Sequence, residues 1–183
     1  WHKWKLLEVR FRKERYDPGY PFKSYEQAWR ECFENVFSKL GNGDASAAAR
    51  ASVIALGQRD LFPETFNMIT RLKEAKHLRR GILSNSDNGS LWPLLKRHGL
   101  QFDATVCSEA ALAYKPDPHV FSVISSALNV PAKLCLFVGD SQYDDVQGAH
   151  KVGMQTVWVN RQEVPPDPAL PLPDYQVADL YGV

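Results

Sequence analysis

The stretch that decides the fold reads LCLFVGDSQYDD and covers residues 134–145. Its apolar first half predicts a strand that ends directly before Gly139 and Asp140. Asp144 and Asp145 follow and open a predicted helix. A strand that leads through a polar turn into a helix is typical of an α/β sheet, and such sheets bind their ligands at the carboxyl ends of the strands. We therefore expect the functional site at this turn.

The same alternation continues on both sides of this stretch. Short apolar runs predict strands at about 81–83, 104–107, 134–138 and 155–159, with a weaker one at 175–177. Apolar residues at helical spacing predict helices from about 63, through 91–95, from about 118 and from about 144. Strands that alternate with helices indicate βαβ units, so we predict an α/β fold with a Rossmann-like parallel sheet flanked by helices.

The first third of the chain gives no strand signal. It predicts three helices, of which the second starts near Tyr25 and stops at Gly41, and the third runs from about Ala45 to Leu56. We predict a small all-helical cap over residues 1–58 and the α/β core over residues 59–183.

Composition limits the possible functions. The chain has 183 residues, 44% of them hydrophobic, which suits one core domain with a small cap. Its 22 basic and 21 acidic residues leave a net charge of +1, which argues against extended nucleic-acid binding, although a single basic groove stays open. No apolar run is long enough to span a membrane, and no signal peptide is visible. The three cysteines lack metal-ligand spacing, so we expect a cytoplasmic protein.

Two further segments place polar residues after predicted strands. Ser84 and Asn85 follow the first strand, where a hydroxyl and backbone N–H groups can hold an anionic oxygen; a serine there is also common as a plain turn or capping residue. Lys115 lies in a loop stiffened by two prolines, with Asp117 placed to cap the next helix. Lys115 is either a surface charge or a fixed cation over a phosphate or carboxylate.

Carboxylates in the decisive stretch predict a metal site. Mg²⁺ takes one or two carboxylates together with waters and substrate oxygens. Asp140, Asp144 and Asp145 supply that chemistry within six residues. The alternative is an acidic helix N-terminus stabilised by the helix dipole.

Taken in order and spacing, these segments resemble the haloacid dehalogenase-like (HAD) hydrolase superfamily. Ser84 matches its second motif, Lys115 its third, and Gly139-Asp140 with Asp145 its fourth. The neighbouring sequences YKPDP at 114–118, DVQGA at 145–149 and VWVNR at 157–161 are similar to this family too. The resemblance covers nearly the whole chain, and the helical cap is most similar to the 2-haloacid dehalogenase branch and its phosphatase-like relatives.

The resemblance implies catalytic roles for Ser84 and Lys115. Ser84 would bind the transferring group, which Asn85 would help to position, and Lys115 would neutralise nucleophile and phosphate. Asp140 would bind Mg²⁺ as the cofactor. Asp145 would complete the metal shell or anchor it from behind.

Asp144 competes with Asp145 for that last role. We expect Ser84, Lys115 and Asp140 to converge on one pocket at the same edge of the sheet, with Asp145 close to Asp140.

One element of the family pattern is missing. The family's nucleophile is an aspartate at the end of a first strand, which lies in the middle of the sheet between the strands that end at Ser84 and Asp140. Asp17 is an early aspartate, but it sits in a Pro-Gly turn with no strand before it. We therefore predict that the first core strand is absent from this chain and that the chain alone is inactive.

Three explanations for the absence stay open. N-terminal residues are missing from the chain, which begins with Trp1 rather than Met; the strand comes from another chain, as a complementing segment or a homodimer; or the protein is a non-catalytic relative. Unpaired backbone groups in a buried sheet are costly. We therefore expect the two neighbouring strands to be separated by a gap or filled by another segment.

For function, the leading hypothesis is a Mg²⁺-dependent phosphatase that acts on a small phosphorylated metabolite through an aspartyl intermediate. Its rival is a metal-independent dehalogenase of halogenated metabolites, whose fourth motif resembles Ser-Ser-Asn where this chain has Gly139-Asp140-Ser141. An added carboxylate beside an aspartate nucleophile is unfavourable without a cation, which favours the phosphatase. A non-enzyme alternative makes residues 1–15 a basic amphipathic helix for a membrane surface or a partner, although a cap helix explains the same residues.

Overall fold

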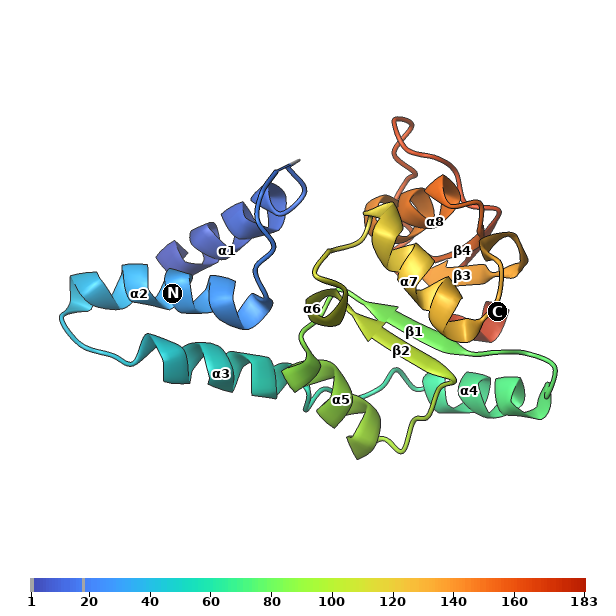
Figure 1. The fold of residues 1–183 in the computed structure, drawn as a ribbon, viewed down its shortest axis with the longest axis horizontal. Helices are drawn as coiled ribbons and strands as arrows, with labels where there is room; N and C mark the ends of the chain where they lie inside the picture. The colour runs from blue at the N-terminus through green and yellow to red at the C-terminus, as the bar shows by residue number, and fades with distance from the viewer. Residues whose placement is uncertain (1, 18) are drawn as a thin grey trace. The chain divides into compact units, whose positions relative to one another are not determined.

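The computed structural model describes residues 2–17 and 19–183, which divide into two compact units (Figure 1). The helical unit comprises Trp1–Arg59, Ser84–Leu100 and Cys107–Tyr114. The sheet unit comprises Asp60–Leu83, Gln101–Val106 and Lys115–Val183. The division into a cap over 1–58 and a core over 59–183 stays a prediction.

Among its described residues the helical unit contains five helices: α1 (His2–Glu14), α2 (Tyr25–Leu40), α3 (Ala45–Leu56), α5 (Asn88–Arg97) and the short α6 (Ser108–Ala111). The stop predicted for the second helix is confirmed, because Gly41 takes the left-handed conformation (φ 74°) that ends a helix without strain. The predicted third helix matches α3 in both of its bounds.

Aromatic rings form the core of the helical unit. Phe11 of α1 meets Tyr25 of α2 edge to face, with ring centroids 5.8 Å apart, and Tyr114 meets Tyr25 at 5.6 Å. Trp4 packs against Trp29 at 6.0 Å. The apolar face of α1 is therefore engaged within its own unit, as expected for a cap helix.

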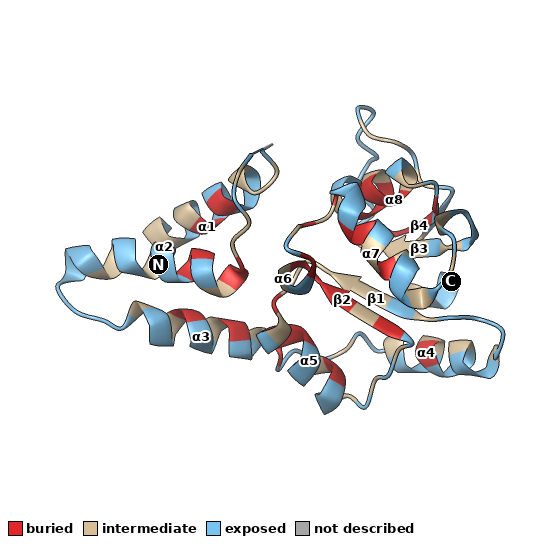
Figure 2. Ribbon diagram, in the orientation of Figure 1, coloured by how far each residue is buried: buried red, intermediate tan, exposed pale blue. Residues whose placement is uncertain are grey.

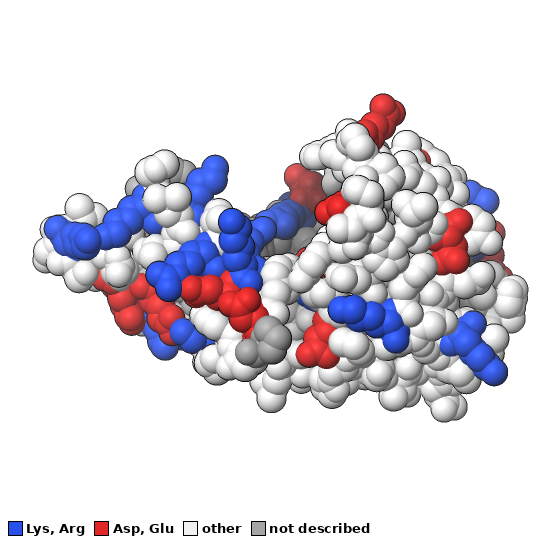
Figure 3. All heavy atoms as spheres, turned by 90° about the horizontal axis from the view of Figure 1, so that it is seen from above, with Lys and Arg blue, Asp and Glu red and all other residues white. Residues whose placement is uncertain are grey.

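Charges of both signs cover this unit, as the spheres in Figure 3 show. Several of its basic side chains pair with carboxylates: Arg10 with Glu14, Arg12 with Glu8, Lys23 with Glu31, Arg30 with Glu34 and Arg50 with Glu26.

Within the described residues no helix is both long and apolar enough to cross a bilayer.

The sheet unit holds two separate sheets. β1 (Gly81–Ser84) pairs with β2 (Ala104–Cys107), and β3 (Leu136–Gly139), β4 (Gln155–Val159) and β5 (Tyr175–Val177) form a parallel sheet in the order β3-β4-β5. The last residues of β1 and β2, Ser84 and Cys107, are grouped with the helical unit. The helices of the sheet unit are α4 (Thr65–Glu74), α7 (Pro118–Leu128) and α8 (Gln147–Lys151), with short turns η1 (Ala132–Leu134), η2 (Gln142–Val146) and η3 (Leu180–Gly182). The predicted α/β fold with parallel sheets and flanking helices is confirmed.

One helix lies over both sheets. Phe121 of α7 packs against Phe137 of β3, with ring centroids 5.0 Å apart, and a Cβ on Gly81 of β1 would lie 3.1 Å from Ile124 and 3.0 Å from Leu128. A helix is about 10 Å wide, which is roughly two strand spacings. β1 and β3 thus share a covering helix without pairing, as expected where a strand is missing between them.

The burial of the strands supports this interpretation. All residues of β1 and β3 are exposed or half-buried, whereas most residues of β2 and β4 are buried (Figure 2). Leu136, at the start of β3, is 50% exposed. In an α/β sheet the inner strands are normally the more buried ones. Among the described residues, therefore, each of these two strands lacks a neighbour on one side.

Two predicted boundaries were wrong. Leu134, predicted to start a strand, ends η1, because Pro131 opens a tight turn in which Leu134 N–H donates to the Pro131 carbonyl at 2.9 Å. The helix predicted from Asp144 begins earlier, as the wide-turn helix η2 that leads into α8.

Candidate active site

The turn after β3 is organised by the Asp145 carboxylate. Its Oδ2 accepts the Ser141 backbone N–H at 2.9 Å, and its Oδ1 accepts a hydrogen bond from Lys115 Nζ at 2.5 Å. Asp145 is 2% exposed. A buried carboxylate needs such partners, so Asp145 serves as an internal anchor that ties the turn to the loop of Lys115.

Gly139 is required by this anchor. A Cβ on Gly139 would lie 2.3 Å from the carboxylate carbon of Asp145 and 2.3 Å from its Oδ2. Sterics therefore explain why glycine precedes Asp140 at the end of β3, since only glycine leaves room for the buried carboxylate of Asp145.

Lys115 is positioned by the loop that leads into α7. Its peptide bond to Pro116 is cis, and Asp117 caps α7 by accepting the His119 backbone N–H at 2.8 Å, as predicted. The Lys115 side chain is 12% exposed, and its Nζ lies 5.4 Å from the Phe137 ring centroid. Lys115 is thus a fixed, largely buried cation at the end of β3 rather than a surface charge.

Asp140 presents its carboxylate to solvent. The residue is exposed, while its backbone carbonyl accepts a hydrogen bond from Trp158 Nε1 at 3.0 Å. Asp144 is half-buried, and its backbone N–H donates to Ser141 Oγ at 3.0 Å, which caps η2. The structure therefore brings Lys115 and Asp145 into contact next to Asp140.

Ser84 and Asn85 belong to the helical unit, where Ser84 closes β1 and Asn85 opens the following loop. That loop is held by α6: Ser108 Oγ donates to the Ser86 carbonyl at 2.9 Å, and the Asn88 backbone N–H donates to Glu109 at 2.7 Å. Both predicted residues therefore lie on a well-bonded turn. The convergence of Ser84 with Lys115 and Asp140 stays a prediction.

The sequence interpretation missed Asp87. The residue is 3% exposed, and its carboxylate accepts the backbone N–H groups of Tyr25 at 2.9 Å and Glu26 at 2.7 Å, at the start of α2. Burial raises the pKa of this carboxyl. Asp87 therefore joins the Ser84–Asn85 loop to a cap helix. Its place in a polar turn gave no signal of this, because the partner lies 62 residues earlier.

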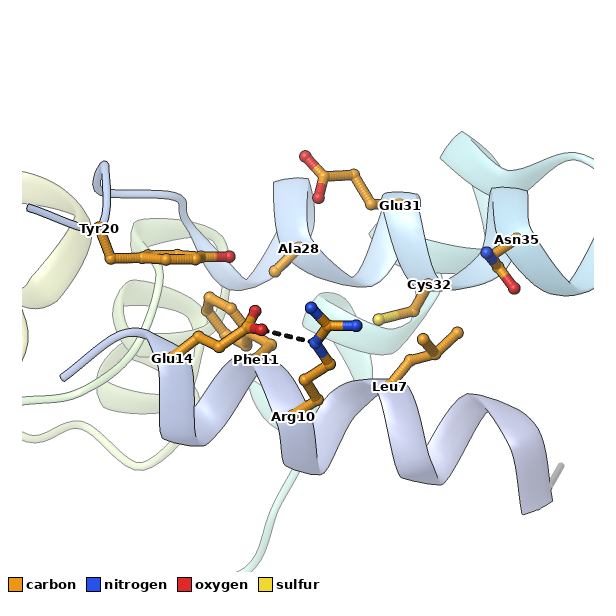
Figure 4. Close-up of a pocket in the computed structure, with 9 residues that line it drawn as sticks. All are labelled: Leu7, Arg10, Phe11, Glu14, Tyr20, Ala28, Glu31, Cys32 and Asn35. Carbon is orange, nitrogen blue, oxygen red and sulfur yellow. Dashed lines mark hydrogen bonds and ion pairs between the residues drawn. The ribbon is translucent and has the colours of Figure 1, made fainter. Parts of the chain in front are cut away.

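A hollow of about 200 Å³ opens within the helical unit between α1 and α2 (Figure 4). Its lining residues are Leu7, Arg10, Phe11, Glu14, Tyr20, Ala28, Glu31, Cys32 and Asn35. None of the predicted site residues borders it. Burial raises the pKa of the Cys32 thiol to about 11, so this thiol stays protonated and unreactive near neutral pH. The hollow is not a candidate catalytic site.

The side chains near the turn after β3 offer few ligands for a metal ion. In the described part of the chain, no group of three or more His, Cys, Asp or Glu side chains is arranged to hold a metal ion. Mg²⁺ needs only one or two carboxylates, however. Both Asp145 oxygens already accept hydrogen bonds, which leaves Asp140 as the exposed carboxylate. A Mg²⁺ ion at this turn would therefore be held by Asp140, with Asp145 supporting the turn from behind.

Comparisons with known proteins identify the family of the chain. The family model for haloacid dehalogenase-like hydrolases matches residues 7–153. The (S)-2-haloacid dehalogenase H-109 of Pseudomonas putida is 30% identical over 165 residues, which cover 87% of this chain and 71% of that protein. Phosphoserine phosphatase from Thermus thermophilus is 33% identical over 168 residues, which cover 85% of this chain and 66% of that protein.

A solved structure shows the same architecture. The 2-haloacid dehalogenase from Pseudomonas syringae pv. Tomato DC3000 superposes with a TM-score of 0.73 and 26% identity, covering 98% of this chain and 76% of that chain. The family match spans most of the chain, and the relatives on both sides of the dehalogenase–phosphatase division are hydrolases. The chain therefore belongs to the haloacid dehalogenase-like hydrolases.

Proposed function

We propose that this chain forms the body of a Mg²⁺-dependent phosphatase that acts on a small phosphorylated metabolite. One observation carries the proposal: the exposed carboxylate of Asp140 directly follows β3, beside the buried Lys115–Asp145 pair. Carboxylates that gather around an aspartate nucleophile repel it unless a cation is bound, and Mg²⁺ is the cation that such oxygen ligands hold best.

In this proposal a strand that carries the aspartate nucleophile completes the sheet between β1 and β3. The open edges of these two strands and the helix α7 that lies over both support such a strand. The strand comes either from the same polypeptide or from another chain. Parallel strands end at the same edge, so its last residues would arrive next to Asp140 and Lys115.

Each candidate site residue of this chain would then have its own role in the reaction. Lys115 would neutralise charge on nucleophile and phosphate, held in place by its bond to Asp145. Ser84 would donate to a phosphoryl oxygen, with Asn85 beside it. Asp140 would hold Mg²⁺, which when bound offsets the phosphate charge in the transition state.

The test is to restore the missing strand. A strand ending in Asp-x-Asp-x-Thr is joined ahead of Trp1, and the product is assayed for release of phosphate from small phosphomonoesters. We expect hydrolysis with Mg²⁺ and none in chelator. Asp140→Asn should lower the rate by roughly 10²-fold or more, the range seen on loss of one transition-state stabiliser. Asp144→Asn tests the weaker candidate for the same metal site, and we expect it to lose less activity than Asp140→Asn because Asp144 is half-buried.

A second candidate is a metal-independent 2-haloacid dehalogenase. It is favoured by the P. putida relative, which is named for that activity and is 30% identical over most of the chain. The same restored protein separates the two candidates. Halide release from 2-haloacids that chelator does not diminish, together with no phosphate release, would overturn the phosphatase proposal.

A further inference from the structure

The peptide between Asp140 and Ser141 is held at both of its polar ends. Its carbonyl accepts the Trp158 indole N–H at 3.0 Å, and its N–H donates to Asp145 Oδ2 at 2.9 Å. A peptide unit is planar, so two hydrogen bonds on opposite sides fix the orientation of the whole plane. The plane begins at the Cα of Asp140, from which the candidate metal-binding side chain projects.

Trp158 reaches this peptide because of the strand register. In the parallel pair of β3 and β4, Trp158 lies opposite Gly139, one residue before Asp140. Trp158 is 3% exposed. A buried indole N–H without an acceptor costs about 1–3 kcal/mol, so the bond to Asp140 is strongly favoured over a rotated ring.

The Asp140 carboxylate has no such support of its own. It is exposed and has neither an ion pair nor a hydrogen bond to another side chain in the described part of the chain. Its direction therefore depends on the backbone, which Trp158 and Asp145 hold.

We propose that Trp158 is a positioning residue that fixes the Asp140 peptide and thereby aims the Asp140 carboxylate. The expectation that the Asp140 carboxylate binds a divalent cation rests on the proposed function. The expectation that Trp158 fixes the Asp140 peptide does not, so either expectation can fail without the other.

The test compares Trp158→Phe with Trp29→Phe in the full chain. Both rings are buried, at 3% and 5% exposure, but the Trp29 indole N–H meets no acceptor among the described residues. The two variants therefore lose similar apolar contacts, and the first loses one more hydrogen bond. Circular dichroism and thermal unfolding establish that both fold.

The first measurement is metal-free NMR. In Trp158→Phe we expect the Asp140 carbonyl ¹³C resonance to shift and the order parameter of the Ser141 N–H to fall below the value of about 0.85 that is typical of rigid backbone. Trp29→Phe should leave both unchanged. If both variants match the unsubstituted chain at these positions, Trp158 does not fix this peptide and the inference is overturned.

The second measurement is the affinity for Mn²⁺ by electron paramagnetic resonance, with Mg²⁺ as competitor. We expect Trp158→Phe to bind roughly tenfold more weakly, the lower end of the loss seen when the support of a metal ligand is removed. Trp29→Phe and the unsubstituted chain should bind alike. Equal affinity in all three proteins, despite a changed Asp140 peptide, would overturn the positioning role.

If Asp140→Asn does not weaken binding, or the unsubstituted chain binds no Mn²⁺, the proposed metal site fails instead. The NMR comparison then decides the structural inference by itself. Should Trp158→Phe not fold, the unsubstituted chain gives the same decision through its indole protons. That of Trp158 exchanges with solvent more slowly than that of the comparably buried Trp29, which meets no acceptor among the described residues, if the bond to Asp140 is present, and equally fast if it is not.

Discussion

Lys115 Nζ lies 2.5 Å from Asp145 Oδ1, and the two side chains are only 12% and 3% exposed. The pair joins the loop that opens α7 to the turn that follows β3, across 30 residues of sequence. Removal of one partner from a buried pair leaves an uncompensated charge, whereas removal of both does not.

Lys115→Met and Asp145→Asn should therefore each lower the free energy of unfolding by about 3–5 kcal/mol. The double variant should lose clearly less than the sum of the two. Urea unfolding of the four proteins gives the coupling energy. Strictly additive losses would mean that the pair contributes nothing as a pair.

Gly139→Ala should destabilise the chain by about 1–3 kcal/mol, because its Cβ would enter the space of the Asp145 carboxylate. The control is Gly89→Ala in α5, where the new Cβ would lie 3.3 Å from Val53 and alanine favours the helix. Thermal unfolding compares them. Equal stability of the two variants would contradict the steric explanation of the Gly-Asp pair.

Asp87→Ala should cost about 2 kcal/mol or slightly more, since two backbone N–H groups at the start of α2 lose their acceptor in a buried place. Asp44→Ala removes an exposed cap from α3, where Asp44 accepts the Ala47 N–H at 2.9 Å, and should cost about 1 kcal/mol. The measurement is urea unfolding at one pH. A smaller loss for Asp87→Ala than for Asp44→Ala would show that the buried bonds are not worth more than an exposed cap.

Asp87 should also give stability a pH dependence of known sign. Burial raises the folded-state pKa of this carboxyl, so the folded chain binds its proton more tightly than the unfolded chain does. Its contribution to stability is complete below the ordinary carboxyl value near 4 and is lost as the pH rises through the raised value. The difference in unfolding free energy between the unsubstituted chain and Asp87→Asn should therefore decrease with rising pH in that window. A difference that stays constant or grows would contradict the sign.

The sequence was most informative where local chemistry decides the structure. The bounds of α3, β2, β4 and β5 agree with the predicted ranges, because each is set by an apolar run and its neighbouring turn residues. The N-cap role of Asp117 was predicted correctly for the same reason. Such features depend on residues within one or two turns of the chain.

What the sequence could not show depends on contacts between distant segments. The bond from Trp158 to the Asp140 carbonyl follows from strand register, and the Asp87 cap joins residues 62 positions apart. The pairing of Lys115 with Asp145 was likewise not visible, since Lys115 had been expected to neutralise nucleophile and phosphate and Asp145 to complete or support the metal shell. The partners of the motif residues thus could not be predicted from the sequence, and the catalytic and metal-binding roles of the motif residues stay predictions.

The Asp87 cap has a consequence for protein engineering. Exchange of residues 1–58 for the cap of a relative would leave a buried carboxylate facing a foreign backbone, and the new helix would have to offer N–H groups at the same two positions. Tyr114 makes a second such bond, as its hydroxyl donates to the Lys23 carbonyl at 2.8 Å. A chimera should therefore exchange residues 84–100 and 107–114 together with residues 1–58. The exchanged module then includes both partners of these hydrogen bonds, although they are far apart in the sequence.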